Sequence, residues 1–378
     1  MTDEKLRRSQ SVATEFMKKL RIGFLSTAGI GRKNWKAIFN SGNAVVTAVA
    51  SRELNKSRNF VDECQREFKF ENPPRALGSY EALLASPDVD AVYIPLPTGL
   101  RKKWVLRSAA TGKHVVCEKP CGVSAADLNQ MIAACARNRV QFMDGVMFMH
   151  SLRLPQIRKV LDDGKSVGGI RRISSAFNFL GHGSFSRTNI RADGTLEPAG
   201  CLGDLGWYNI RYSLWAMNWN LPHTVTGKIH SQSAAARGRV PSPMEFSGEL
   251  FFNGGVSAGF YCSFVAQFQQ WAVVIGEKGY LRVPDFVHMR NAPAFEVNGT
   301  EVRVKVPGAA SRSRSADSLE MGHATAQDTQ MWRNFAKQAA SGKLNREWPM
   351  WAAKTQIVLD ACHKAARRNA AVKLESKL

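Results

Sequence analysis

The chain has 378 residues, of which 44% are hydrophobic and 22% are charged, so it is long enough for two domains and is neither disordered nor fibrous. Its longest apolar runs, such as residues 44–50, are far shorter than the roughly 18 residues of a membrane-spanning helix, so we expect no membrane span. The net charge of +21 suits an anionic small ligand, but the basic residues are spread along the chain, which argues against a nucleic-acid partner.

The N-terminus and the cysteines indicate the compartment. Residues 1–20 are polar and charged without an apolar centre, so we interpret them as an N-terminal extension and not as a secretory signal. The seven cysteines form no Cys-x-x-Cys pair and have no histidine at zinc spacing. We therefore expect reduced thiols, no metal site and a cytoplasmic location.

From residue 21 to about 145, short apolar runs alternate with helical patterns. The expected strands are 22–25, 44–50, 91–94, 114–117 and 141–145. A first helix follows the turn after strand 22–25 and ends at residue 39, and the other expected helices are 56–68, 80–84, 101–111 and 125–137. Parallel strands need crossover connections that cover the sheet. The alternation therefore predicts an α/β domain with a doubly wound parallel sheet over residues 21–145.

The second domain, expected over residues 146–378, has longer runs of aromatic and β-branched residues. The expected strands are 170–180, 225–230, 244–252, 256–264, 271–274 and 302–306, the expected helices are 205–217, 325–340 and 350–369, and 302–318 resembles a mobile surface loop. These patterns predict an α+β domain with a large, open, mostly antiparallel sheet. The helix at 350–369 is long enough to pack back onto the first domain.

A dinucleotide site needs a tight turn between a strand and a helix, so that backbone N–H groups face the pyrophosphate. In the G-x-G-x-x-G frame the three positions are Ser26, Ala28 and Gly31, with Gly29 and Ile30 between the last two. Only the third position is a standard glycine. The alternative is a generic strand-to-helix turn without a ligand. The surrounding alternation of strands and helices favours a dinucleotide-binding turn.

The end of the second strand indicates which nicotinamide cofactor is bound. An acid there binds a ribose hydroxyl, whereas a cation binds a 2′-phosphate. Ser51 replaces the acid, and Arg52 stands 21 residues after Gly31, where its guanidinium can hold a phosphate. NADP(H) is therefore favoured over NAD(H), although Glu53 follows directly; Lys56 is either a second phosphate contact or helix surface.

Three residues suggest the chemistry. Lys119, in the tripeptide that starts at Glu118, follows the strand 114–117, at the edge where open α/β sheets bind ligands. Asp204 and Tyr208 are four residues apart, so on a helix they share one face, and a phenol near a lysine can act as acid or base in carbonyl reduction. The structural alternatives are a surface lysine and a helix-capping aspartate beside a half-buried tyrosine.

Three further residues are weaker candidates for substrate contacts. His150, Arg191 and Trp207 lie in segments that we expect to border the cleft, and each alone is more often structural than functional. Substrate specificity is expected to depend on the loops 181–199 and 234–243.

Several segments together resemble the Gfo/Idh/MocA oxidoreductase family over about residues 20–372. They are the strand-turn-helix opening, 78–84, 88–94, 112–115 with Glu118-Lys119-Pro120, the glycine-rich stretch 200–208, and 276–279. The tripeptide in this setting is the most specific of them. Within the family the chain is most similar to the branch that contains glucose-fructose oxidoreductase and dimeric dihydrodiol dehydrogenase.

The resemblance implies a Rossmann domain, a C-terminal sheet used to form a homodimer or homotetramer, and hydride transfer between a nicotinamide and a hydroxyl-bearing carbon. It also implies that Lys119 is the catalytic lysine, Asp204 its supporting carboxylate and Tyr208 the acid or base. A cis bond before Pro120 is typical of the family. Pro95, Leu96, Pro97 and Thr98 would form the loop along the cofactor, and Glu118 and Lys119 are further candidates for cofactor contacts.

Our hypothesis is an NADP(H)-dependent dehydrogenase or reductase that acts on a sugar, a polyol or a small carbonyl or diol. The alternative is a nicotinamide-binding regulatory or sensor protein without turnover. The retained lysine and tyrosine argue against the sensor, because a sensor needs no acid-base pair.

Overall fold

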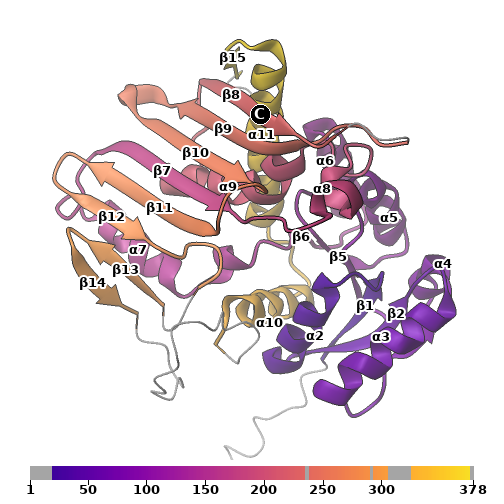
Figure 1. Cartoon of the computed structure of the whole chain (residues 1–378). Coiled ribbons are helices and arrows are strands. Elements are labelled where there is room, and N and C mark those ends of the chain that lie inside the picture. Colours follow the sequence, from indigo (N-terminus) through magenta and orange to yellow (C-terminus); the bar gives the residue numbers. More distant parts are fainter. Residues whose placement is uncertain (1–18, 235–237, 290–292, 305–324, 375–378) are drawn as a thin grey trace, which may run out of the picture.

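The computed structural model describes residues 19–234, 238–289, 293–304 and 325–374 (Figure 1). Most of the expected N-terminal extension, part of the loop 234–243 and most of the expected loop 302–318 lie outside these ranges. Two sheets with their helices make up the described chain.

The first sheet confirms the doubly wound prediction. Its six strands are all parallel, in the order β3-β2-β1-β4-β5-β6, and helices α2 to α6 form the crossovers. The strands are β1 (Leu20–Leu25), β2 (Ala44–Ala50), β3 (Arg75–Leu77), β4 (Ala91–Ile94), β5 (His114–Cys117) and β6 (Phe142–Asp144), and the helices are α2 (Ile30–Ser41), α3 (Leu54–Glu67), α4 (Tyr80–Leu84), α5 (Thr98–Ala110) and α6 (Ala125–Arg137).

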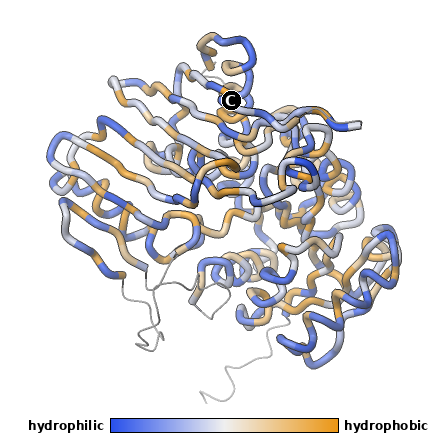
Figure 2. The backbone as a smooth tube through the Cα atoms, viewed as in Figure 1, coloured by the Kyte–Doolittle hydropathy of each residue, from blue (hydrophilic) through white to orange (hydrophobic). Residues whose placement is uncertain are grey.

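Local sequence signals set the boundaries of these helices. The Ser79 hydroxyl accepts a hydrogen bond from the Ala82 N–H at the start of α4, and Ser124 does the same for Asp127 at the start of α6. Gly42 ends α2 with a left-handed φ of 80°. All four residues of β4 are buried, as expected of a strand covered by helices on both faces. Figure 2 shows hydrophilic residues on the outer surface of α3 and α4.

The second sheet has nine strands, in the order β14-β13-β12-β11-β7-β10-β9-β8-β15. All pairs are antiparallel except β7 with β10, so the prediction of a mostly antiparallel sheet is confirmed. The strands are β7 (Ile170–Asn178), β8 (Thr224–Gln232), β9 (Pro243–Phe251), β10 (Ser257–Ser263), β11 (Gln269–Gly276), β12 (Tyr280–Val283), β13 (Ala294–Val297), β14 (Thr300–Arg303) and β15 (Val372–Lys373).

Helices cover one face of the second sheet and connect it to the first. Figure 1 shows α9 (Trp207–Ala216) and α11 (Glu347–Arg368) behind the sheet, whereas the face turned to the viewer carries no helix of the described chain. The Asp360 carboxylate of α11 accepts a hydrogen bond from the Ala125 N–H at 2.6 Å, so α11 contacts the start of α6. In the same way α10 (Gln327–Ala340) packs against α2.

Some elements differ from the sequence prediction. The helix expected over 205–217 begins earlier, as a π-helical turn η3 (Leu202–Gly206) that continues into α9. The strand expected over 302–306 is β14, which ends at Arg303. The elements that were not predicted are short or lie between stronger signals: β3, β12, β13, β15, α7 (Arg153–Asp162), α8 (Phe185–Thr188), η1 (Met147–His150), η2 (Ile190–Ala192) and η4 (Asn253–Gly255). In the described ranges, no helix combines the length and apolar character needed to cross a bilayer.

Candidate active site

The turn after β1 has the form of a dinucleotide turn despite its unusual residues. Ser26 has a φ of 136°, a conformation that favours glycine, and its hydroxyl accepts a hydrogen bond from the Ala28 N–H at 3.0 Å. The Gly31 N–H donates to the Ala28 carbonyl at 2.8 Å and closes the turn. Ser26 thus replaces the first glycine of the fingerprint and stabilises the strained backbone with its own side chain.

The N-terminus of α2 can receive a phosphate. Its N-cap residue, Gly29, provides no side-chain cap, and the first turn contains no acid. A Cβ atom on Gly31 would lie 2.9 Å from the Phe60 ring, so a glycine is required for α2 to pack against α3. The turn therefore has the open N–H groups and the close packing that a pyrophosphate site needs.

The residues at the end of β2 lie apart from the central cavity. Ser51 is buried and its N–H donates to the Leu77 carbonyl at 3.1 Å. Arg52 is exposed, close enough to Tyr80 for its charge to oppose the increase in the pKa of Tyr80 that burial causes. Lys56 forms a surface ion pair with Glu53 at 2.6 Å. The structure therefore leaves the Arg52 side chain accessible to a ligand and gives Lys56 a structural partner.

A cavity of about 500 Å³ lies where the carboxyl ends of β1, β4 and β5 meet the helical layer of the second sheet. It brings together most of the predicted site. The predicted residues that line it are Ala28, Gly29, Ile30, Pro95, Leu96, Glu118, Lys119, Arg191, Asp204 and Tyr208.

Lys119 is fixed at the centre of this cavity. The Lys119–Pro120 peptide bond is cis, and Lys119 Nζ donates hydrogen bonds to the backbone oxygen of Asp204 at 2.7 Å and to its Oδ1 atom at 2.6 Å. The ammonium also lies 4.8 Å from the centre of the Tyr208 ring. Two of its three N–H groups are bonded to Asp204, so one remains for a ligand.

Asp204 holds two cations. Its Oδ2 atom lies 2.9 Å from Arg191 Nε, so the carboxylate bridges Arg191 and Lys119. Burial alone would raise the pKa of Asp204, but the charges and hydrogen bonds of Arg191 and Lys119 outweigh burial and lower the pKa to about 2. The Asp204 charge in turn raises the pKa of Arg191. The carboxylate is therefore ionised at any physiological pH.

The π-helical turn places Asp204 beside Lys119. A Cβ atom on Gly203 would lie 3.0 Å from the Ala199 side chain and 3.2 Å from the Pro120 ring. The absence of a side chain at Gly203 therefore lets η3 pack closely against Pro120, next to the cis bond that follows Lys119.

Tyr208 keeps its proton. It is buried, and burial, followed by the charges of Glu118 and Asp204, raises its pKa well above 10. Its hydroxyl donates only a weak contact to Met147 Sδ, at 3.9 Å. Tyr208 can therefore donate a proton or a hydrogen bond to a ligand oxygen in the cavity.

A chain of buried hydrogen bonds fixes Glu118. The Trp332 indole N–H donates to Asn34 Oδ1 at 2.7 Å, Asn34 Nδ2 donates to the Tyr93 hydroxyl at 2.8 Å, and Tyr93 donates to Glu118 Oε1 at 2.6 Å. The chain runs from α10 through α2 and β4 to the end of β5. It holds the carboxylate at one position in the cavity wall.

The loop 95–98 is bonded to the second domain. The Thr98 N–H and hydroxyl donate to the Glu197 carboxylate at 3.0 and 2.5 Å, so Glu197 caps the N-terminus of α5. Buried Arg101 donates to the carbonyls of Leu96 and Pro120. Pro97, the N-cap of α5, and Thr98 lie beside the cavity and do not line it.

Two weaker candidates lie in the protein core. His150 packs edge-on against Trp348, and burial lowers its pKa to about 3, so it remains neutral. The Trp207 side chain is fully buried, with the Arg211 guanidinium 5.7 Å from its ring. Of the three weaker candidates, the cavity includes only Arg191.

Sequence reasoning missed several lining residues, namely Lys33, Phe177, Phe179, Glu197, Phe268 and His288. Lys33 had a sequence signal, since a lysine two residues after Gly31 lies in the first turns of the nucleotide-binding helix. Glu197 lies in the loop 181–199, which was expected to influence specificity, but the residue itself was not singled out. The other four come from the second domain and had no such signal.

Two family models match the chain. One describes an oxidoreductase family with an NAD-binding Rossmann fold and matches residues 20–146, and the other describes the GFO/IDH/MocA C-terminal domain and matches residues 155–282. The chain therefore belongs to the GFO/IDH/MocA oxidoreductase family, which confirms the resemblance drawn from the sequence.

Named relatives and solved structures agree with this assignment. The chain is 31% identical to trans-1,2-dihydrobenzene-1,2-diol dehydrogenase of Mus musculus, over 70% of this chain and 74% of the relative. It is 28% identical to D-xylose 1-dehydrogenase (NADP(+)) 2 of Haloferax volcanii, over 94% and 100%. The aldose-aldose oxidoreductase of Caulobacter crescentus has a similar fold, with a TM-score of 0.76 at 21% identity, covering 94% and 100% of the two chains. A 3-ketoreductase of Actinomadura kijaniata, in complex with NADP and TDP-benzene, also has a similar fold. Its TM-score is 0.75 at 23% identity, and the match covers 92% of this chain and 98% of that chain.

Proposed function

We propose that the protein is an NADP(H)-dependent oxidoreductase that transfers a hydride between the nicotinamide and a carbon bearing a hydroxyl or carbonyl group in a sugar, polyol or small diol. The observation that carries the proposal is that Lys119, Asp204 and Tyr208 meet in the same cavity as the open N-terminus of α2. The Haloferax relative is named as an NADP(+) enzyme and the Actinomadura structure contains NADP, which supports the choice of cofactor.

The cofactor fits the residues that are present. The N–H groups at the start of α2 would hold its diphosphate, and Arg52 would hold the 2′-phosphate, because a guanidinium forms paired hydrogen bonds with phosphate oxygens. Pro95 and Leu96 would lie along it in the cavity wall. When bound, the nicotinamide supplies or accepts a hydride.

In the direction of reduction, the substrate carbonyl oxygen lies between Lys119 and Tyr208. The free N–H of Lys119 hydrogen-bonds to that oxygen and stabilises the negative charge that develops on it. Tyr208 then donates its phenolic proton, which its raised pKa has retained. In the direction of oxidation, Tyr208 must first lose its proton, which its raised pKa disfavours. Asp204 and Arg191 keep Lys119 in position throughout.

Replacing Tyr208 with Phe tests this role. With D-xylose and trans-1,2-dihydrobenzene-1,2-diol in the substrate panel, we expect kcat to fall about 10²- to 10⁴-fold, because the proton donor is lost, while NADPH affinity is unchanged. Tyr280→Phe, a change at an exposed residue of β12 outside the cavity wall, is the matched control and should leave both values unchanged. Unaltered turnover in Tyr208→Phe would refute the role. NADPH binding without turnover of any substrate by the unaltered protein would favour the sensor alternative.

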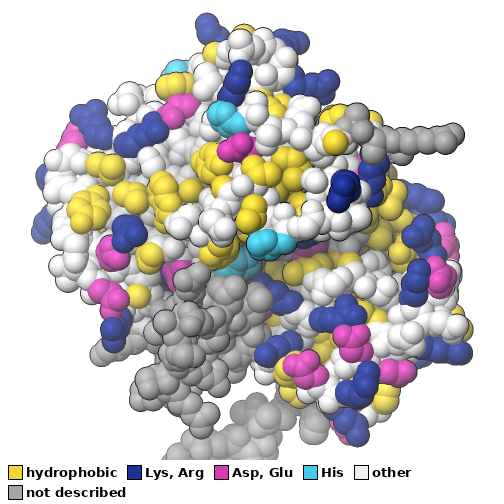
Figure 3. Space-filling view, in the orientation of Figure 1, with side chains coloured by type: hydrophobic (Ala, Val, Ile, Leu, Met, Phe, Trp, Pro, Cys, Tyr) yellow, Lys and Arg dark blue, Asp and Glu magenta, His cyan; other side chains and the backbone are white. Residues whose placement is uncertain are grey.

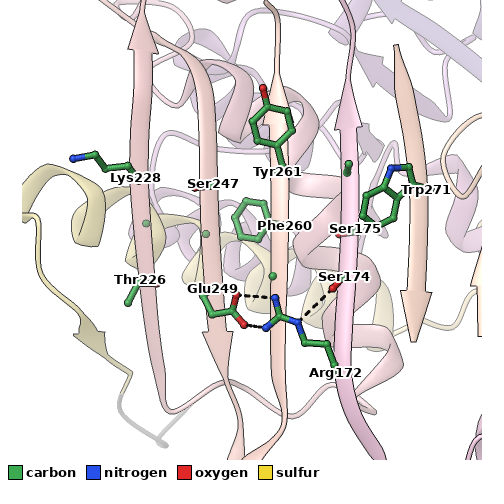
Figure 4. Close-up of a pocket in the computed structure, with 14 residues that line it drawn as sticks. Arg172, Ser174, Ser175, Thr226, Lys228, Ser247, Glu249, Phe260, Tyr261 and Trp271 are labelled. Atoms are coloured by element: carbon green, nitrogen blue, oxygen red, sulfur yellow. Dashed lines mark hydrogen bonds and ion pairs between the residues drawn. The ribbon is translucent and has the colours of Figure 1, made fainter. Parts of the chain in front are cut away.

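We also propose that the helix-free face of the second sheet joins two copies of the chain. The strands β7 to β11 form a shallow hollow there. Its lining consists mainly of small residues from β7, β8, β9 and β10, together with Tyr261, Trp271 and the Arg172–Glu249 ion pair (Figure 4). Figure 3 shows hydrophobic side chains gathered on this face, while the Lys and Arg side chains are scattered over the visible surface. A broad, mixed face of this kind is typical of a homo-oligomer interface and not of a nucleic-acid site.

A further inference from the structure

Lys33 is a buried cation that the proposed mechanism does not use. It lies on α2, and its side chain, which is 16% exposed, contributes to the cavity wall. The nearest carboxylate oxygen is Asp328 Oδ2 at 3.9 Å, which is beyond hydrogen-bond distance. Across the described ranges Lys33 Nζ has no hydrogen-bond acceptor, so its three N–H groups are available to a ligand in the cavity.

The surroundings do not fully compensate this charge. Burial lowers the pKa of Lys33, and the charge of Lys119 lowers it further, while Asp328 and Glu118 oppose the shift. Other acids in the wall have close partners of their own, since Glu118 accepts from Tyr93 and Asp204 is bonded to Lys119. A buried ammonium without a hydrogen-bonded partner is unfavourable, so a ligand oxygen that carries negative charge would stabilise it.

Two neighbours strengthen this preference for an anion. The N-terminus of α2, at Gly29 and Ile30, lies in the same wall without a side-chain cap or a nearby acid on the helix, and it adds a partial positive charge. His288 lies on the opposite domain, and burial together with the charges of Lys33 and Lys119 lowers its pKa to about 3. His288 is therefore neutral and leaves Lys33 as the charged donor on this part of the wall.

We propose that Lys33 binds an anionic oxygen of the ligand that fills the cavity, as a cationic group separate from Lys119 and Arg191. Two ligands carry such an oxygen at this place: the dinucleotide, in its diphosphate, and a substrate with a carboxylate. Binding of the dinucleotide diphosphate by Lys33 rests on the proposed function. Binding of a substrate carboxylate would extend the proposed function to acidic substrates.

Lys33→Met tests the proposal, because it removes the charge and keeps the length of the side chain. Lys36→Met is the matched control, since Lys36 lies on the same helix with its ammonium 5.1 Å from the Phe68 ring, outside the cavity wall. Three titrations are followed by fluorescence: NADPH, 2′-phospho-ADP-ribose, which retains the diphosphate and lacks the nicotinamide, and L-tartrate added to the NADPH complex.

Loss of a charged hydrogen bond is expected to raise the dissociation constant of the affected ligand about 10- to 100-fold in Lys33→Met and less than about twofold in Lys36→Met. Weakened binding of both NADPH and 2′-phospho-ADP-ribose identifies the diphosphate as the source. Weakened binding of L-tartrate alone identifies a substrate carboxylate.

Equal binding of all three ligands by Lys33→Met and the unaltered protein would overturn the inference and leave the proposed function intact. Failure of the unaltered protein to bind NADPH would instead contradict the proposed function. In that case L-tartrate binding is compared between the cofactor-free unaltered protein and Lys33→Met; weaker binding by the variant supports the inference, and equal binding overturns it. Thermal unfolding of each variant monitors folding. If Lys33→Met does not fold, Lys33→Gln replaces it.

Discussion

Replacing Asp204 with Asn is the change whose effect can be worked out most directly from the structure. The carboxylate is 15% exposed and bridges Lys119 at 2.6 Å and Arg191 at 2.9 Å. Its pKa falls from an ordinary 3.8 to about 2 in the folded protein. At 1.36 kcal/mol for each pKa unit, the ionised carboxylate stabilises the fold by about 2 kcal/mol at neutral pH.

Asn keeps the shape of the side chain and removes the charge, which leaves two partly buried cations without their partner. Breaking a buried ion pair on one side costs about 3 to 5 kcal/mol. We therefore expect the free energy of unfolding of Asp204→Asn, measured by urea titration at pH 7, to be lower by between about 2 and about 5 kcal/mol. Turnover should also fall, because Lys119 loses one of the two bonds that fix its Nζ atom.

The pH dependence gives a sharper test. The pKa of Asp204 is lower in the folded than in the unfolded chain, so its contribution is complete above pH 4 to 5 and is lost as the pH falls towards 2. The difference in the free energy of unfolding between the unaltered protein and Asp204→Asn should thus shrink by about 1 kcal/mol from pH 7 to pH 3. Asp360→Asn is a control in which the pH effect has the opposite sign, because burial raises the pKa of Asp360. The free energy of unfolding that Asp360→Asn loses relative to the unaltered protein should grow as the pH falls. Equal stability of Asp204→Asn and the unaltered protein at pH 7, or a deficit that does not change with pH, would refute the reasoning.

Two further predictions concern the cofactor and the assembly. Arg52→Ala should weaken NADPH about 10- to 100-fold and leave NADH nearly unchanged in parallel fluorescence titrations, because only NADPH carries the 2′-phosphate; equal effects on both cofactors would contradict the role of Arg52. Val273→Arg places a charge on the open face of β11 and should convert a dimer to a monomer in light-scattering measurements, whereas Val123→Arg, an exposed position in the first domain, should not; a monomeric unaltered protein, or an unaffected dimer, would contradict the interface.

Some features of the site follow from the sequence because they depend on neighbouring residues. The alternation of apolar runs and helical patterns was sufficient for the parallel sheet, because each strand and each crossover has its own local period. The same locality placed Lys119 at the end of β5 and gave Asp204 and Tyr208 a common side of one helical segment. The family resemblance rested on such short stretches as well.

The tertiary structure decided what lies beside these residues. Arg191 is far from Lys119 in the chain, and only the folded loop brings it to the other side of Asp204. His150 resembled a cleft residue in the sequence, but packing against Trp348 places it in the core. Strand β7 pairs in parallel with β10 and antiparallel with β11, an order that the spacing of strands along the chain does not contain.

The sequence by itself therefore determined the two sheets and predicted three residues that line one cavity, because hydrophobic periodicity and short motifs are local properties of the chain. The tertiary structure alone determined the burial of Lys33, the ion pairs of Asp204 and the open face of the second sheet. These depend on contacts between residues that are distant in sequence, and packing over the whole molecule selects such contacts.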